Sequence, residues 1–253
     1  MKTWIKEIDI FNRHGKQFVP DLRKAVLPAI FRGRPVIGAD ISDEEARRVE
    51  KLCPVGAIGT EPCTIDLGKC VFCRECEFSL PGKITFTHDH KIAAVRREDL
   101  IIRQGEDNPV KIDPANVRKE IRTLFKHALK LRQVSAAGDN SAEMELNAAG
   151  NVNFDMGRYG IEFVASPRHA DGIVITGPVS ENMAEALQIC YDAVPSPKII
   201  VLVGTDAISG GIFQDSPAVH REFLKKYPVD LYVPGNPPHP LTFINGVLDL
   251  IGR

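Results

Sequence analysis

Apolar residues in the second half of the chain gather into short runs rich in valine and isoleucine. Four runs have the length and composition of buried β-strands, at residues 161–165, 172–176, 198–203 and 229–233. Helical patterns follow the later strands, at residues 180–193, 218–227 and 240–251. Because strands that alternate with helices form parallel sheets with helices on their faces, the pattern predicts an α/β domain.

Glycine and proline gather just after these predicted strands. They occur at Gly177-Pro178, Gly204, Gly210-Gly211 and Pro234-Gly235. Ligands of open parallel sheets bind beyond the carboxyl ends of the strands. We therefore expect these loops to form the functional edge of the domain.

A helical pattern also precedes the first strand. Asp113 can cap a helix and Pro114 suits its first position. Apolar residues then recur at helical spacing, at Val117, Ile121, Leu124, Ala128 and Leu131. The other side is basic, with Arg118, Lys119, Arg122, Lys126, Lys130 and Arg132. The pattern predicts a long helix whose basic face is either solvated or a docking face.

The first 35 residues, called the arm below, combine basic and apolar residues. They hold eight lysines and arginines against three acidic residues, together with Trp4, Ile5, Ile8, Ile10 and Phe11. A basic, apolar arm can lie on an anionic membrane face or along a partner protein. An arm that packs on its own domain explains the same composition, so both interpretations stay open.

Composition narrows the class of protein. The chain has 253 residues, of which 43% are hydrophobic, enough for one large domain or two smaller ones. Its formal net charge of −1 gives no general attraction to nucleic acid. No apolar run approaches the roughly 20 residues of a membrane span, and no signal peptide is recognisable. Six cysteines without a secretion signal are therefore expected to bind metal in a reducing cytoplasm.

Four of the six cysteines have the spacing of iron–sulfur ligands. Cys70, Cys73 and Cys76 form a C-x2-C-x2-C run, and Cys53 is followed by proline. In two-cluster ferredoxins, such a run and the Cys-Pro cysteine of the other half hold one cluster. A structural zinc site is the alternative, although zinc sites favour paired C-x2-C knuckles. The spacing predicts one 4Fe–4S cluster in a ferredoxin-like α+β module.

A second ferredoxin cluster has no cysteines left to hold it. Counting at ferredoxin spacing from Cys53 and Cys76 locates the missing ligands at Asp43, Ala46, Val49 and Leu80. These four positions form the complete ligand set of one cluster, so we expect apolar packing by Val49 and Leu80 instead. Cys63 and Cys190 are left over, and a small buried thiol is the expectation for Cys190.

Six segments of the second half occur together in one family of redox subunits. They are residues 124–134, 153–160 (NFDMGRYG), 165–171, 175–179, 204–211 (GTDAISGG) and 233–238 (VPGNPP). In this order they resemble the small, cluster-binding subunit shared by respiratory complex I and membrane-bound nickel–iron hydrogenases, including formate hydrogenlyase. The first half resembles the two-cluster ferredoxin subunit of the same complexes, beginning at residues 31–35 (FRGRP). The chain thus resembles a fusion of two neighbouring subunits.

The resemblance implies a flavodoxin-like fold and a second 4Fe–4S cluster held by four cysteines. The corresponding positions here are Asp139, Ala142, Asp206 and Asn236. Because alanine cannot bind iron and carboxylates are hard donors, we expect no cluster in this domain. Three interpretations of these positions, with nearby Glu143, stay open. They are a hydrogen-bond network with Arg158, Arg168 or water, ordinary solvated acids, and a hard cation such as Mg²⁺ or Ca²⁺.

The sequence thus divides into four parts. They are the basic apolar arm (1–35), a ferredoxin-like 4Fe–4S domain (36–95), a connector with the basic helix (96–134), and an α/β domain without cluster ligands (135–253). The resemblance implies a non-catalytic iron–sulfur subunit of a membrane-associated, complex I-like or hydrogenase-like oxidoreductase. Such a subunit transfers electrons, docks a large subunit and lies at the inner face of the cell membrane. The alternative is a structural or regulatory subunit of such a complex whose terminal electron relay has been lost.

Overall fold

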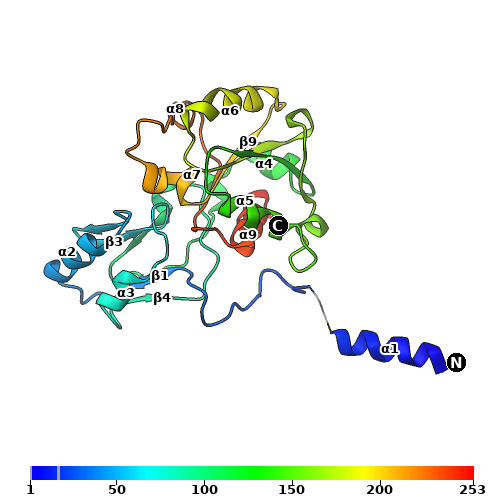
Figure 1. Cartoon of the computed structure of the whole chain (residues 1–253), viewed down its shortest axis with the longest axis horizontal. Coiled ribbons are helices and arrows are strands. Elements are labelled where there is room, and N and C mark those ends of the chain that lie inside the picture. The colour runs from blue at the N-terminus through cyan, green and yellow to red at the C-terminus, as the bar shows by residue number, and fades with distance from the viewer. Residues whose placement is uncertain (1, 16–17) are drawn as a thin grey trace.

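A computed structural model of the chain describes residues 2–15 and 18–253. Helix α1 (Lys2–His14) stands clear of a body that contains the two predicted halves (Figure 1). One core cluster joins those halves, since it contains Ile37 and Val49 of the first and Ile173 and Leu202 of the second. The halves therefore pack as one body.

The second half is built on a five-stranded parallel sheet. Its strands are β6 (Leu129–Ser135), β7 (Ile161–Phe163), β8 (Gly172–Thr176), β9 (Ile199–Val203) and β10 (Leu231–Val233). They lie in the order β10-β9-β8-β6-β7, and every neighbouring pair is parallel. This is the flavodoxin order, so the predicted fold class is confirmed.

Alternate residues of the strands pack against different helices, because successive side chains point to opposite faces. Val174 and Val201 share a core cluster with helices α4 (Lys119–Leu124), α5 (Ser141–Ala149) and α9 (Pro240–Ile251). Their neighbours Ile173 and Ile200 share the other cluster with Leu187 of helix α6 (Glu181–Ala193) and with the first half of the chain. The sheet therefore lies between two layers.

The first half is a small α+β module, as predicted. Strand β1 (Pro35–Ile37) pairs with β4 (Ile84–Phe86), and β2 (Ile58–Thr60), β3 (Cys63–Asp66) and β5 (Ile101–Arg103) form an antiparallel sheet. Helices α2 (Asp43–Leu52) and α3 (Glu75–Ser79) flank the strands. The remaining short elements are η1 (Arg97–Leu100), η2 (Pro114–Asn116), η3 (Met156–Tyr159), η4 (Pro167–His169), α7 (Thr205–Ser209), η5 (Gly211–Phe213) and α8 (Glu222–Lys226).

The predicted long basic helix is wrong, because the segment forms the separate short turn η2, the short helix α4 and then a strand. Asp113 does cap a turn, since its carboxylate accepts a hydrogen bond from the Ala115 amide at 2.9 Å. The helix, however, ends at Leu124, and Leu129–Ser135 forms β6, a strand inside the sheet. Leu131 fits both the predicted helical spacing and, with Leu129, strand alternation. Both leucines are buried where β6 lies between β7 and β8, and this burial decides for the strand. The six basic residues are therefore spread over different elements.

Part of the arm is fastened to the α/β domain. The Val19 amide donates to the Asn153 carbonyl at 2.8 Å, and Asn245 Nδ2 donates to the Leu22 carbonyl at 3.0 Å. Arg23 also pairs with Asp249 at 2.7 Å. Within residues 2–15 and 18–253, no helix is long and apolar enough to cross a bilayer.

Candidate cluster site and acidic hollow

Cys70 and Cys73 of the C-x2-C-x2-C run lie on a tight loop that leads into α3, and Cys76 lies in the first turn of that helix. Phe72 and Arg74 have φ angles of 54° and 69°, which turn the chain around the cysteine side chains. Cys53 caps the C-terminus of α2. Arg32 Nη1 donates to the Phe72 carbonyl at 2.9 Å and ties the arm to this loop. Arg32 belongs to the segment 31–35 at the start of the ferredoxin resemblance, but the sequence did not predict its contact with the cysteine loop.

The four predicted ligands face one another closely enough to interact electrostatically. Burial is the main cause that raises the pKa of the Cys70 thiol to about 12, and the sulfurs of Cys76, Cys53 and Cys73 contribute smaller amounts in the same direction. Burial likewise raises the pKa of Cys76 to about 11, with smaller contributions from Cys73 and Cys53. Such thiols ionise only when a positively charged group binds them.

Backbone amides are already aimed at two of these sulfurs. The Ala57 amide donates to Cys53 Sγ at 3.2 Å, and the Phe72 amide donates to Cys70 Sγ at 3.4 Å. Hydrogen bonds to the sulfurs are among the features that tune protein-bound clusters. These amides stabilise negative charge on the thiolates.

Among the described residues, no three histidine, cysteine or acidic side chains meet closely enough to share one metal ion. A 4Fe–4S cube makes no such demand, because each of its four thiolates binds a different iron atom. Four soft donors whose charges interact, two of them with amide donors, therefore suit a cube better than a single ion.

The positions of the missing ferredoxin cluster are largely filled by apolar packing. Ala46, Val49 and Leu80 are all buried in one core cluster, while Asp43 begins α2 at the surface. The expected packing by Val49 and Leu80 therefore agrees with the structure. Cys63 is fully buried on β3 and Cys190 is partly buried on α6.

The four non-cysteine positions of the second domain do come together. Asp139, Ala142, Asp206 and Asn236 all line one small space, called the acidic hollow below. Each follows a strand of the parallel sheet or begins the next helix, at the edge where ligands of such folds bind. Close approach of Gly138 and Gly177 brings two of these loops together, since a Cβ on Gly177 would lie 2.4 Å from the Gly138 nitrogen.

Hydroxyl groups satisfy most of the polar atoms in the acidic hollow. Glu143 accepts hydrogen bonds from Ser135 and Thr176, both at 2.6 Å. Asp139 accepts from the Ser141 hydroxyl at 2.6 Å, which lowers the pKa of the Asp139 carboxyl. A hydrogen-bond network is therefore present, but its partners are hydroxyl groups and not the predicted arginines. Neither predicted arginine lines the hollow, and Arg158 instead donates to the Val19 carbonyl.

The acidic hollow is too small for a cube as the loops stand. The volume in which the centre of a water molecule fits is about 10 Å³, so the hollow has room for about one water molecule. Arg221 fixes one wall, because its guanidinium donates to the Ala207 and Ile208 carbonyls at 2.8 and 2.9 Å. These bonds hold the end of α7, the helix that carries Asp206.

We expect Asp206→Asn to stabilise the protein at neutral pH. Burial raises the pKa of the Asp206 carboxyl, and the charges of Asp139 and Glu143 raise it further. Above both its folded and its unfolded pKa, the ionised carboxylate destabilises the fold, and this penalty disappears as the pH falls through the folded pKa. The amide should add roughly 0.5–1 kcal/mol to the unfolding free energy at pH 7, measured in urea.

The increase in unfolding free energy caused by Asp206→Asn should become smaller when the same experiment is done at lower pH. Asp215→Asn, at an exposed aspartate of the neighbouring loop, is the matched control and should change little. If Asp206→Asn instead lowered the unfolding free energy at pH 7, repulsion among Asp206, Asp139 and Glu143 would be contradicted. That result would favour a hard cation bound by these carboxylates.

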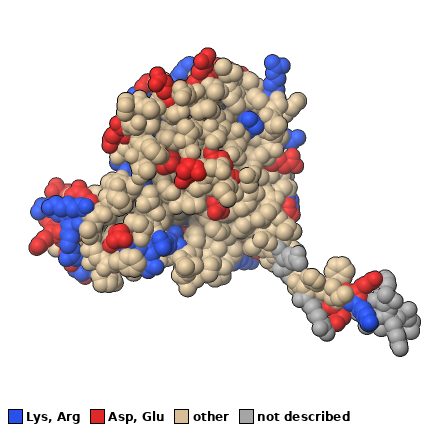
Figure 2. All heavy atoms as spheres, in the orientation of Figure 1, with Lys and Arg blue, Asp and Glu red and all other residues tan. Residues whose placement is uncertain are grey.

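Three exposed apolar side chains belong to elements that form or adjoin the acidic hollow. Met144 of α5 is 64% exposed, and Ile212 and Phe213 of η5 are 69% and 42% exposed. Gly211 packs against the Asp206 carboxylate, so η5 begins beside the hollow. Figure 2 shows a largely uncharged face over α5 and α7, with a few acidic side chains near its centre. We call Met144, Ile212 and Phe213 the apolar rim. The sequence alone did not predict that these side chains are exposed.

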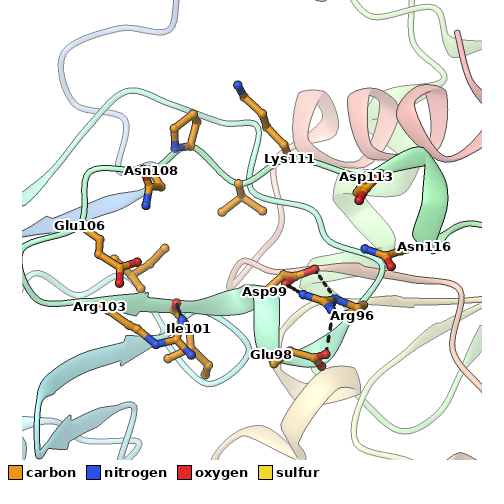
Figure 3. A pocket seen from close by; sticks show the side chains of 13 residues that line it. Arg96, Glu98, Asp99, Ile101, Arg103, Glu106, Asn108, Lys111, Asp113 and Asn116 are labelled. Atoms are coloured by element: carbon orange, nitrogen blue, oxygen red, sulfur yellow. Dashed lines mark hydrogen bonds and ion pairs between the residues drawn. The ribbon is translucent and has the colours of Figure 1, made fainter.

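A larger hollow lies elsewhere, where residues 106–116 pass β5 (Figure 3). Its volume is about 330 Å³ and its lining contains charges of both signs. Arg96 is already paired with Asp99 at 2.6 Å and with Glu98 at 3.4 Å. The residues described along this lining include no cysteine, so the hollow is separate from the candidate cluster site.

Comparison with known proteins places the second half in one family. The family described as "NADH ubiquinone oxidoreductase, 20 Kd subunit" matches residues 140–250. The probable membrane-bound hydrogenase subunit mbhJ of Pyrococcus furiosus is 36% identical over 115 residues, which are 46% of this chain and 69% of that protein. A subunit of the NADH-quinone oxidoreductase of Heliobacterium modesticaldum is 46% identical over 108 residues, 42% of this chain and 62% of that protein.

A solved structure of the membrane-bound sulfane sulfur reductase, an archaeal respiratory membrane complex, contains a similar chain. The identity is 30% and the TM-score 0.44, over 50% of this chain and 70% of that one. The family match begins after the cysteine-bearing module.

Proposed function

Because the chain belongs to the family of the 20 kDa subunit of NADH ubiquinone oxidoreductase, we propose that it is an iron–sulfur subunit of a membrane-associated oxidoreductase. The complex is complex I-like or hydrogenase-like, and the subunit lies on its cytoplasmic side. Cys53, Cys70, Cys73 and Cys76 hold one 4Fe–4S cluster, which supplies one-electron transfer when bound. The observation that supports this proposal is that the four thiols lie near enough for their charges to interact, with amide donors to two of them.

The second half docks the large subunit of the complex through the face around the acidic hollow. Three exposed apolar side chains in the apolar rim favour a protein contact, because large apolar groups at interface centres contribute strongly to binding. The face lies at the carboxyl ends of the strands, where this fold class binds its ligands. The role of the chain's own residues there is to position and hold the partner.

A structural or regulatory subunit is the second candidate. The acidic hollow favours it, because carboxylates and about 10 Å³ of space occur where the resemblance implies a cluster. The cluster in the first half would then have no relay beyond it on this chain. In that case the cluster is reduced by dithionite but takes no part in the turnover of the complex.

Affinity purification from the native membrane under anaerobic conditions tests the proposal. We expect a tagged chain to bring down a hydrogenase-like or complex I-like large subunit in equal amount. Recovery of the chain as a stable monomer that carries the cluster would instead support a free ferredoxin-like electron carrier. If the complex forms, freezing it during turnover and recording the EPR signal of the cluster separates electron transfer from the structural role.

A further inference from the structure

Exposed apolar side chains are concentrated in the arm. Of the fourteen large apolar side chains exposed among the described residues, six lie between residues 8 and 30. They are Ile8, Ile10, Phe11, Phe18, Val26 and Ile30. Phe11 is 78% exposed, Ile30 77% and Val26 91%. An arm that packs on its own domain would bury such residues, so that interpretation of the sequence does not explain them.

The arm is also positively charged on an otherwise acidic chain. Its eight basic and three acidic residues give a balance of +5, and the whole chain carries −1, so residues 36–253 carry −6. Lys24, with 86% of its side chain exposed, lies beside the exposed Val26. Apolar and basic side chains therefore occur together, as in segments that lie on anionic membranes.

The body holds the arm so that its apolar residues face outward. Leu22 is fully buried, and its carbonyl is bound by Asn245. On either side of this anchor, Phe18 and Val26 line an open groove of about 730 Å³ with Leu27 and Phe154. Figure 1 shows this part of the arm along one edge of the body, with α1 extending from the same end. The exposed groups thus belong to one edge and its extension.

We propose that the arm binds directly to an anionic lipid bilayer. Helix α1 lies in the interface with Ile8 and Phe11 among the lipids, and Val26 and Ile30 extend the contact along the body. Lys6 and Lys24, both exposed, contact the lipid phosphates. Arg23, Arg32 and Arg34 are instead bonded to the body and take no part. The charge of the arm favours an anionic bilayer as the partner. The acidic body is repelled by an anionic surface, so the arm is the part of the chain that approaches it. The contact involves neither the cluster nor the apolar rim.

Sedimentation of the full chain with vesicles tests this inference. We expect binding to vesicles of phosphatidylglycerol and phosphatidylcholine, and at least roughly tenfold weaker binding to phosphatidylcholine alone. Phe11→Glu and Val26→Glu should each weaken binding to the anionic vesicles about tenfold or more, and Lys24→Glu by less. Added salt should weaken it further, because the lipid charges are screened.

Ile189→Glu is the matched control, since Ile189 is 62% exposed on α6, a helix that lies far from the arm in Figure 1. It should leave vesicle binding unchanged. Absence of binding to anionic vesicles, or equal binding of all variants, would overturn the inference. If Phe11→Glu instead abolished recovery of the large subunit and left vesicle binding intact, the arm would be a protein-docking element. If the large subunit is recovered with every arm variant, the proposed function is unaffected even when lipid binding fails. Failure of this inference can therefore be distinguished from failure of the proposed function.

Discussion

Replacement of Cys73 by alanine should reduce the iron of the anaerobically purified chain from about four atoms to less than one. Cys73 lies on the tight loop between Cys70 and Cys76, whose buried thiols cannot ionise singly without a compensating positive group. Loss of one ligand therefore leaves three sulfurs that hold a cube poorly. Iron and acid-labile sulfide per chain, with the EPR signal after reduction, measure the effect.

Cys190→Ser provides the control for this experiment. Cys190 is a free thiol on α6, outside the group of interacting sulfurs, and its replacement should leave both iron and sulfide unchanged. About eight irons in the unmodified chain would mean that oxygen donors of the acidic hollow hold a second cluster. That result would contradict the expected absence of a cluster there and restore an unbroken relay.

Strong apolar runs and caps made much of the fold predictable. The strand at 172–176 and the helix at 240–251 begin and end where the sequence indicates, because both are bounded by glycine or proline and buried along their length. Strand β6 was missed because Leu131 fits both the helical spacing of the preceding residues and the strand alternation with Leu129. Only its place between β7 and β8 resolves the ambiguity, and that is a property of the whole sheet.

The sequence predicted more residues of the candidate cluster site than of the acidic hollow. Cysteine spacing alone grouped Cys53 with Cys70, Cys73 and Cys76, since ferredoxin geometry fixes which sulfurs meet. Asp206 and Asn236 follow two predicted parallel strands, so their meeting at one edge of the sheet could also be expected, whereas Asp139 follows β6, which the sequence did not predict. The hydroxyl partners of Glu143 could not, because Ser135 and Thr176 look like ordinary strand ends. Exposure of Ile212 and Phe213 depends on the turn at Gly210 and leaves no pattern in sequence.

Ile212→Glu should weaken association with the large subunit by roughly thirtyfold or more. Ile212 is the most exposed residue of the apolar rim, at 69%, and it lies beside the acidic hollow. Truncation of an apolar anchor near the centre of an interface typically costs about 2 kcal/mol or more. A glutamate there also adds a like charge next to Asp206. The complex is diluted in steps, and the amount of large subunit recovered with the tagged chain is measured at each step. Comparison of the variant with the unmodified chain gives the change in affinity.

Ile189→Glu makes the same chemical change at a similarly exposed position of α6 and should leave the association intact. Comparison of the two variants separates loss of a specific contact from a general effect of charge, while the iron content of each reports whether the first half remains folded. Equal recovery with both variants would remove the apolar rim from the interface. The large subunit would then have to bind another face, and the acidic hollow would lose its connection to docking. Loss of recovery with Ile212→Glu alone ties the partner to the edge of the sheet where the four non-cysteine positions meet.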